Sequence, residues 1–260
     1  MEVVMVLVRS ALAAFFVAMM MPAFALAQEG VLRVGTEGAY PPFNFFDSNR
    51  QLQGFDVDIA NAVCEKLKMK CEFTAQDWDG IIPALLAKKF DVIIASMSIT
   101  EERKKKVDFT NKYYNTPARF VAAKDSDVKS VDPAALAGKT LGAQSATIHA
   151  NYLQEKYKDA EIKLYGSQDE ANLDLVSGRL DAILADSTVL YEWMKTADGK
   201  CCEFVGEPLS DPAFFGIGAG FALRKDETEL REKLNKAIAE IRADGTYEKI
   251  NAKYFPFSVY

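Results

Sequence analysis

Short apolar segments alternate with amphipathic segments along most of this chain. Residues 31–36 alternate between apolar and polar positions, as in a strand with one buried face. Residues 90–95 form a continuous apolar run, which is typical of a strand buried on both faces. Between them, Ile59, Ala60 and Val63 lie on the single apolar stripe of a helix. This alternation predicts an α/β fold in which helices cover a parallel sheet.

Polar residues mark the places where several helices should begin. We expect Asp56 to cap the start of the first helix and Asp79 the start of the second. Ser98 and Glu101 have the spacing of a capping box, which predicts another helix start. Near the end of the sequence, a helical apolar repeat predicts a long amphipathic helix that Gly245 terminates.

One seven-residue pattern occurs twice. Residues 89–95 and residues 179–185 each have a basic residue, an apolar residue, an aspartate and then an apolar strand that ends in alanine. Small polar residues follow both copies, at 96–98 and at 186–188. Because ligands of open α/β sheets bind at the carboxyl ends of strands, two such units facing each other would form a cleft with polar groups on both walls.

Composition and charge exclude several classes of protein. The 260 residues are 49% hydrophobic and 26% charged, as in an ordinary globular protein. The net charge of −6 argues against nucleic-acid binding, which normally requires a basic surface. The single histidine, His149, leaves little basis for a zinc site or for histidine-centred catalysis, and we expect it on the surface of a helix. We expect no metal and no cofactor.

The first segment reads as a targeting signal. Residues 10–27 carry no charge and end in Ala-Leu-Ala. A short apolar run with this ending is typical of a secretory signal peptide, here residues 1–27, cleaved after Ala27. The alternative is an uncleaved membrane anchor, because 18 uncharged residues reach the lower limit for a span. We therefore expect an exported protein.

Export would permit disulfide bonds among the four cysteines. Cys64 and Cys71 have a spacing that suits a local bridge, which we favour. Cys201 and Cys202 are adjacent, and a bridge between neighbours is strained. Four cysteines allow three connectivities, and the sequence alone does not choose between them.

Five motifs in order carry a resemblance to a known family. They are TEGAYPPFNF at 36–45, GFDVD at 54–58, WDGIIP at 78–83, SMSITEER at 96–103 and DGTY at 244–247. The chain resembles the periplasmic polar amino-acid-binding proteins of bacterial ABC importers, solute-binding protein family 3. The similarity is greatest to the branch that binds lysine, arginine, ornithine and histidine.

The resemblance implies a type II periplasmic-binding-protein fold with two lobes joined by two hinge strands. Lobe 1 would comprise residues 28–114 plus 219–260, and lobe 2 residues 115–218. It also implies a monomer in the periplasm that closes on a free L-amino acid and delivers it to an inner-membrane ABC permease. No catalytic residue is expected.

The site must satisfy both charges of a zwitterion. Sequestering a carboxylate and an ammonium from water is costly unless each is paired. Taken alone, Arg103 lies in a charged run that indicates a solvated helix face. The resemblance instead implies that its guanidinium grips the ligand's carboxylate through two parallel bonds. Asp186, which follows the second copy of the repeat, would bind the ammonium, although such an aspartate is often only a helix cap.

Small side chains would complete the binding of the amino-acid head. Ser96 would offer its carbonyl or hydroxyl to the ammonium, and Ser98 would combine capping with ligand contact. Ala95 would contribute backbone contacts. Thr147 opens a predicted helix, whose N–H groups suit a carboxylate. The sequence Ser-Ala-Thr departs from the usual family pattern here, which puts the backbone contacts of this loop in doubt.

Three further residues would enclose the ligand's side chain. Tyr40 and Trp78 are candidate walls, because aromatic faces bind aliphatic stems and guanidinium groups. Glu37 matches an acidic position that meets the distal charge of basic ligands in the resembled branch. Glu37, with Asp56 of the GFDVD motif as a second carboxylate near the pocket, favours arginine, lysine or ornithine as the ligand.

Other functions stay open from the sequence. Histidine, glutamine or an opine are alternative ligands, although Trp78 argues against a plain histidine binder. A dehydratase-like enzyme on the same scaffold would need a proton donor, for which Glu37 is the candidate. The sensor domain of a receptor would need a membrane span after the domain, and none is found before Tyr260.

Overall fold

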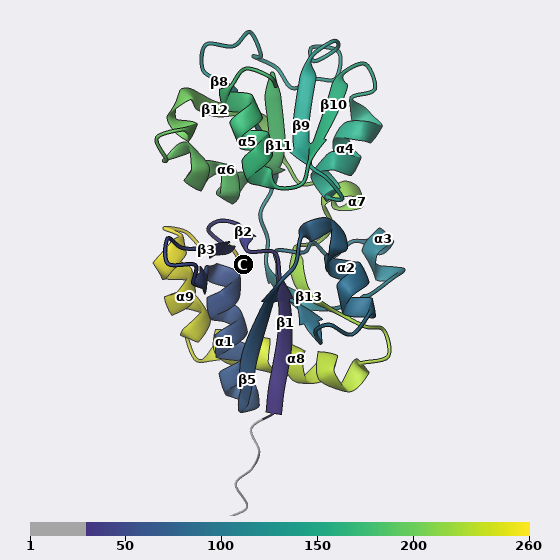
Figure 1. Cartoon of the computed structure of the whole chain (residues 1–260), viewed down its shortest axis with the longest axis vertical. Coiled ribbons are helices and arrows are strands. Elements are labelled where there is room, and N and C mark those ends of the chain that lie inside the picture. The colour runs from purple at the N-terminus through teal and green to yellow at the C-terminus, as the bar shows by residue number, and fades with distance from the viewer. Residues whose placement is uncertain (1–29) are drawn as a thin grey trace, which may run out of the picture.

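The structure is a computed structural model that describes residues 30–260. The expected signal peptide, residues 1–27, lies outside these residues. Two five-stranded sheets lie one above the other, each flanked by helices (Figure 1). In spatial order, the first sheet contains β5 (Met69–Ala75), β1 (Gly30–Thr36), β6 (Val92–Ile93), β13 (Ala219–Leu223) and β7 (Asp108–Tyr114). The second contains β10 (Glu161–Tyr165), β9 (Thr140–Gln144), β11 (Ala182–Asp186), β8 (Ala118–Ala123) and β12 (Cys202–Leu209).

The α/β prediction is confirmed, but the prediction of a purely parallel sheet is wrong. Three neighbouring strands in each sheet are parallel, and the remaining two are antiparallel to their neighbours. The antiparallel strands are those that carry the chain between the sheets, β7 into β8 and β12 back into β13. A strand that leaves one sheet toward the other and a strand that returns must run in opposite directions.

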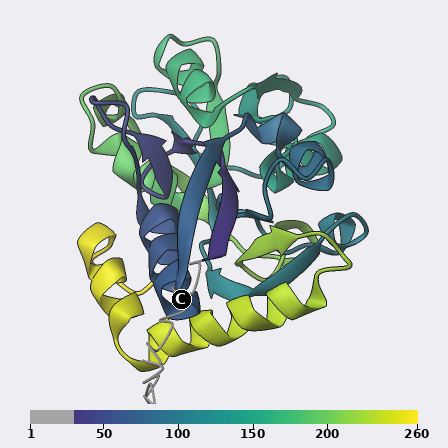
Figure 2. The ribbon, with the colours of Figure 1, turned by 60° about the horizontal axis from the view of Figure 1, so that its bottom comes forward.

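The first unit, which contains the first sheet, has a hydrophobic core on each face of that sheet. The helices α1 (Phe55–Leu67), α8 (Thr228–Ala243) and α9 (Thr246–Tyr254) contribute to one core, and α2 (Trp78–Leu86) contributes to the other. Figure 2 shows α8 running along the lower edge of this unit, with α9 beside α1. The predicted apolar stripe of α8 is buried, and Gly245 follows its end with φ 81°.

The second unit, which contains the second sheet, has the same organisation. Its two cores involve α4 (Ile148–Lys156) on one side and α5 (Gln168–Val176) with α6 (Ser187–Met194) on the other. The short helix α7 (Pro212–Phe215) lies on the return path to the first sheet, and the 3-10 helix η1 (Gly199–Cys201) precedes β12. Because each unit has its own cores, each is packed largely within itself.

The start of α1 differs from the prediction. A small sheet of β2 (Ala39–Tyr40), β3 (Asn44–Phe46) and β4 (Leu52–Gln53) precedes it. Gly54, not Asp56, is the N-cap, with φ 129° and no room for a Cβ, which would lie 2.2 Å from the carbonyl oxygen of Phe43. Asp56 is instead fully buried and accepts hydrogen bonds from Asn44, Ser96 and Tyr113. Burial raises the pKa of Asp56 to about 6.

The N-caps of two other helices also differ from the prediction. Asp77, not Asp79, is the N-cap of α2, and Asp79 accepts hydrogen bonds from Ser145 of the second unit. The helix α3 (Glu101–Lys104) is capped by Thr100, whose hydroxyl accepts from the backbone N–H of Arg103 at 3.2 Å. The prediction of a capping box at Ser98 is therefore wrong, and the N-cap of the helix lies two residues later, at Thr100.

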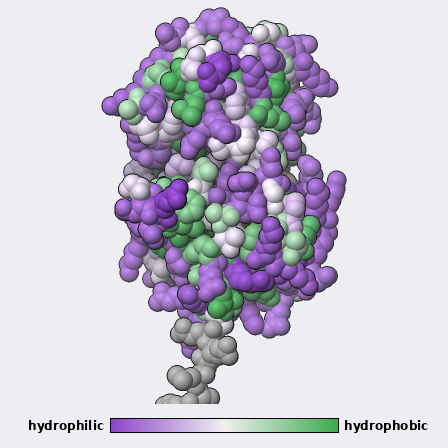
Figure 3. Space-filling model, viewed as in Figure 1, coloured by the Kyte–Doolittle hydropathy of each residue, from purple (hydrophilic) through white to green (hydrophobic). Residues whose placement is uncertain are grey.

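The predicted disulfide between Cys64 and Cys71 is present, and it joins the end of α1 to β5. Cys201 and Cys202 are free thiols, one exposed and one buried. From Gly30 onward, the helices are too short or too polar to cross a bilayer. Figure 3 shows one face that is mostly hydrophilic, with hydrophobic residues in small separate groups.

Candidate ligand-binding site

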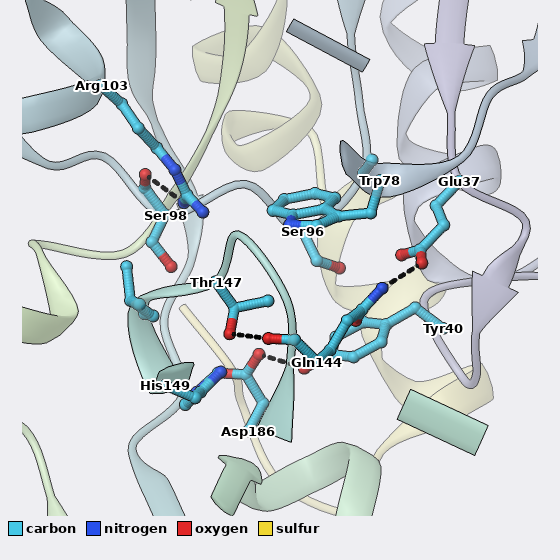
Figure 4. A pocket seen from close by; sticks show the side chains of 12 residues that line it. Glu37, Tyr40, Trp78, Ser96, Ser98, Arg103, Gln144, Thr147, His149 and Asp186 are labelled. Carbon is cyan, nitrogen blue, oxygen red and sulfur yellow. Dashed lines mark hydrogen bonds and ion pairs between the residues drawn. The ribbon is translucent and has the colours of Figure 1, made fainter. Parts of the chain in front are cut away.

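A pocket lies between the two units, at the carboxyl ends of the central parallel strands. All nine residues that the sequence analysis proposed line it, together with three others (Figure 4). The first unit contributes Glu37, Tyr40, Trp78, Ala95, Ser96, Ser98 and Arg103. The second unit contributes Gln144, Thr147, Ile148, His149 and Asp186. The repeat had predicted such a cleft, with polar groups on both walls.

Arg103 places a cation on one wall of the pocket. One of its guanidinium nitrogens donates to the carbonyl of Ser98 at 3.0 Å, and the group lies 5.2 Å from the centre of the Trp78 ring. Removal from water lowers the pKa of Arg103 to about 10, so it keeps its charge at neutral pH. Between residues 30 and 260, no carboxylate forms an ion pair with this guanidinium. It is therefore available to an anionic group in the pocket.

Asp186 places an anion on the opposite unit, at the end of β11 and the start of α6. Tyr40 donates to one carboxylate oxygen at 2.6 Å, and Thr116 donates to the other at 2.8 Å. Both donors are neutral, since burial keeps the pKa of Tyr40 well above its usual range. Within the described part of the chain, neither lysine nor arginine pairs with Asp186. This carboxylate therefore retains capacity for a cation.

Ser96 lies between the pocket and the buried Asp56. Its hydroxyl donates to Asp56 at 3.0 Å, and its backbone N–H donates to the hydroxyl of Tyr113 at 3.3 Å. These two bonds hold Ser96 in a left-handed conformation, with φ 56°, which is unfavourable for a residue with a Cβ. Because its hydroxyl hydrogen is used, Ser96 can offer only oxygen lone pairs and its carbonyl to a ligand.

Thr147 caps α4, as predicted, and its hydroxyl is already committed. It accepts from the backbone N–H of Ala150 at 3.1 Å and donates to the carbonyl of Gln144 at 2.7 Å. The free backbone N–H groups of the first turn of α4 suit an anion better than this hydroxyl does.

Trp78 has two roles in the structure. It is 8% exposed and belongs to a hydrophobic core, yet its ring also lines the pocket. Its indole N–H donates to the carbonyl of Ala146 in the second unit at 3.1 Å. In Figure 4 the ring separates Arg103 from Glu37. The pocket thus has a charged group on either side of an aromatic wall.

Glu37 forms the far end of the pocket. Gln144, the last residue of β9, donates its amide N–H to this carboxylate from the second unit. Burial raises the pKa of Glu37 to about 7, and the negative charges of Asp169, Asp77 and Asp79 act in the same direction. Gln144 was not identified as a site residue from the sequence. Its place at the carboxyl end of a parallel strand could have indicated this role.

The prediction that His149 lies on the surface is wrong. It is 4% exposed and lines the pocket from the first turn of α4. The amphipathic pattern of this helix is weak, because Ile148, His149 and Ala150 are buried in succession. The first turn of α4 points into the space between the units, so both its polar and its apolar side chains are buried.

Comparisons with known proteins support one family. The model of the bacterial extracellular solute-binding proteins, family 3, matches residues 32–257. The L-arginine-binding protein of Pseudomonas aeruginosa is 48% identical over 244 residues, covering 92% of this chain and 93% of that protein. The histidine-binding periplasmic protein of Salmonella typhimurium is 42% identical over 232 residues, covering 88% of this chain and 89% of that protein.

A solved structure supports the same assignment. A periplasmic binding protein of Salmonella typhimurium, described as having high arginine specificity, has a TM-score of 0.81 and 35% identity. The match covers 87% of this chain and 99% of that one. This likeness confirms the predicted fold class, the type II periplasmic-binding-protein fold. The chain therefore belongs to the bacterial extracellular solute-binding proteins of family 3.

Proposed function

We propose that this protein is the substrate-binding receptor of an ABC amino-acid importer and that it binds a free basic amino acid, namely arginine, lysine or ornithine. The observation that carries the proposal is a pocket with a guanidinium on one unit and a carboxylate on the other, where, among residues 30–260, no carboxylate pairs with the guanidinium and no lysine or arginine pairs with the carboxylate. An α-amino acid presents the complementary pair of charges on one carbon atom.

Arg103 would bind the α-carboxylate, and Asp186 would bind the α-ammonium. The planar guanidinium can form two parallel hydrogen bonds to a carboxylate. The backbone N–H groups at the start of α4 would add donors to the carboxylate, and Ser96 would add an acceptor to the ammonium. Since the two charged groups belong to different units, one ligand would hold both units together.

The distal part of the pocket supports a basic side chain. Tyr40 and Trp78 line the pocket between the amino-acid head and Glu37, and Glu37 is a partly buried carboxylate whose described partner is the neutral amide of Gln144. A distal guanidinium or ammonium would give this carboxylate the counter-ion that it lacks. The relatives named for L-arginine support the same choice.

Glu37→Gln is expected to weaken arginine binding roughly ten-fold or more at pH 8, because a charged hydrogen bond is lost. In the wild type, arginine affinity should fall as the pH falls through about 7, since the proton that Glu37 then takes up competes with the ligand's cation. The variant should lose this dependence. Isothermal titration calorimetry at several pH values checks both effects. Equal losses for arginine and glutamine would contradict the assigned role of Glu37.

We also propose that residues 28–114 with 219–260 and residues 115–218 move as two lobes. The chain crosses between the sheets twice, and each unit has its own cores. Around the pocket the units are bridged by hydrogen bonds, such as those from Tyr40 to Asp186 and from Trp78 to Ala146. Such contacts can break and re-form with little cost when the lobes open and close.

The cellular setting follows from the same proposal. The histidine-binding relative is named as periplasmic, which supports a periplasmic location for this protein. An inner-membrane permease would be its partner and would take up the released amino acid. We propose that the protein acts without catalysis, because the relatives compared above are all named as binding proteins.

One observation favours a second candidate function, a dehydratase on the same scaffold. Glu37, with a pKa raised to about 7, could donate a proton to a leaving hydroxyl at neutral pH. Incubation with arogenate should produce no phenylalanine if the protein is only a receptor. Production of phenylalanine that is abolished by Glu37→Gln would establish the enzyme instead.

A thermal-shift panel tests the receptor function directly. The twenty amino acids, ornithine, citrulline and opines are compared at equal concentration. A ligand at 100 times its Kd stabilises the folded protein by about 2.7 kcal/mol, so the best binder gives the largest rise in Tm. We expect arginine, lysine or ornithine to lead. Failure of every amino acid to raise the Tm would overturn the proposed function.

A further inference from the structure

His149 is the single histidine of the chain, and the function described above does not use it. It lies in the first turn of α4, 4% exposed, and lines the pocket. Its Nε2 is buried and has no hydrogen-bond partner among residues 30–260. Oδ1 of Asp186 lies 3.9 Å from this nitrogen, which is beyond hydrogen-bond distance. Figure 4 shows the imidazole beside Asp186.

A buried nitrogen without a partner destabilises a folded protein, so its presence in a pocket points to a partner that arrives with the ligand. Charged and aromatic side chains lie around this imidazole. Asp186 is the anion beside it, Arg103 is the cation across the pocket, and the ring of Phe215 on α7 lies 6.1 Å away. Burial and Arg103 lower the pKa of His149, while Asp186 opposes this shift. The imidazole is therefore neutral at neutral pH, and one ring nitrogen carries a lone pair.

We propose that His149 is a further ligand-contact residue, whose Nε2 accepts a hydrogen bond from the α-ammonium of the bound amino acid beside Asp186. This inference rests on the proposed function, since it assigns a residue to the ammonium end of that ligand. The geometry permits it, because two atoms 3.9 Å apart can both lie about 3 Å from one ammonium nitrogen. Asp186, His149 and Ser96 would then accept the three hydrogens of the ammonium.

The contact makes amino-acid binding sensitive to acid. A proton on Nε2 removes the acceptor, and the imidazolium then pairs with Asp186 and competes with the ligand's ammonium. Because burial places the pKa of His149 below its usual value, full affinity is kept at neutral pH and is lost as the pH falls through that lowered pKa. The loss applies to every α-amino acid, whereas the effect of Glu37 applies only to ligands with a distal charge.

The test compares wild type with His149→Leu and His149→Gln. Leucine fills space without an acceptor, while the amide oxygen of glutamine reaches a position similar to Nε2 and does not titrate. Calorimetric Kd values are measured for arginine and for glutamine at about pH 7.5 and about pH 4.5. Glutamine has no distal charge, so the pH dependence of glutamine binding does not include the effect of Glu37 on a distal cation. Asp56, which titrates near 6, is common to all three proteins.

At the higher pH we expect His149→Leu to weaken binding of both ligands ~10-fold or more and His149→Gln to stay within about 3-fold of wild type. At the lower pH, wild type should lose glutamine affinity relative to His149→Gln. Equal losses in both variants at both pH values would show that the imidazole only fills space and would overturn the inference. If wild type binds no amino acid at either pH, the proposed function itself fails, and the inference fails with it.

Discussion

Arg103→Ala is expected to weaken every amino-acid ligand by about 3–5 kcal/mol, which is roughly 10²- to 10³-fold or more in Kd. Among the described residues that line the pocket, Arg103 is the only arginine or lysine, so without it the ligand's carboxylate would remain there without a counter-ion. The loss should be similar for arginine and glutamine, because both carry the same α-carboxylate. Titration calorimetry at neutral pH measures it.

Arg103→Lys is the matched control for this prediction. Lysine keeps the charge but cannot form two parallel bonds to a carboxylate, so its loss should lie between those of wild type and alanine. Solution scattering adds a second readout. Arginine should reduce the radius of gyration of wild type by closing the lobes, and it should have no effect on Arg103→Ala at the same concentration. Unchanged Kd values in Arg103→Ala would remove this residue from the site.

Asp186→Asn is expected to cause the second large effect, a loss of about 10²-fold or more for all α-amino acids. Asparagine preserves the shape of the side chain. The hydroxyls of Tyr40 and Thr116 can each accept as well as donate, so both can keep a hydrogen bond to it. The substitution therefore removes the charge with little disturbance of the fold, and the ligand's ammonium loses its counter-ion.

Thr116→Val serves as the control for Asp186. It removes one hydrogen bond from a neutral donor to the same carboxylate and leaves the charge that binds the ammonium, so the loss of affinity should be only a few-fold. A pronounced drop in thermal stability of Asp186→Asn without ligand would reveal a structural contribution instead. Comparable Kd values for Asp186→Asn and wild type would show that another group binds the ammonium.

The positions of Ser96 and Asp186 could be predicted because the sequence marks them locally. Asp186 follows an apolar strand in the second copy of a repeat, and Ser96 follows the first copy. The carboxyl ends of parallel strands meet at one edge of a sheet, so these residues were expected to face a common cleft. Arg103 needed the family motif, because its charged neighbours made it look like an ordinary surface residue.

The wrong predictions of helix caps arose where residues distant in the sequence determine which residue caps the helix. Asp56 has the residue type and position of a helix cap, but it is buried by donors from three other segments, Asn44, Ser96 and Tyr113. At the start of α3, Ser98 and Thr100 are both able to cap, but Ser98 forms a β-bridge with Ala219 and Ile99 donates to the carbonyl of Gly218, so the helix begins after Thr100. Residue type alone does not distinguish these cases.

The residues that sequence analysis missed belong to the second unit and face the first. Gln144 gains its importance only when the two units meet, because it bonds Glu37 of the first unit. His149 lies beside Asp186 of its own unit and lines the pocket between the units. No periodic pattern within one element reports a side-chain partner on another element. The sequence does show polar residues at a strand end and in the first turn of a helix. Such positions are too common in proteins to identify a binding site.

A crystal structure of the complex with arginine tests the central claim most directly. We expect the α-carboxylate within hydrogen-bond distance of the Arg103 guanidinium and the α-ammonium within hydrogen-bond distance of Asp186, with the side chain passing Trp78 toward Glu37. An arginine bound in the reverse orientation, or bound elsewhere while Arg103 and Asp186 face only water, would contradict it.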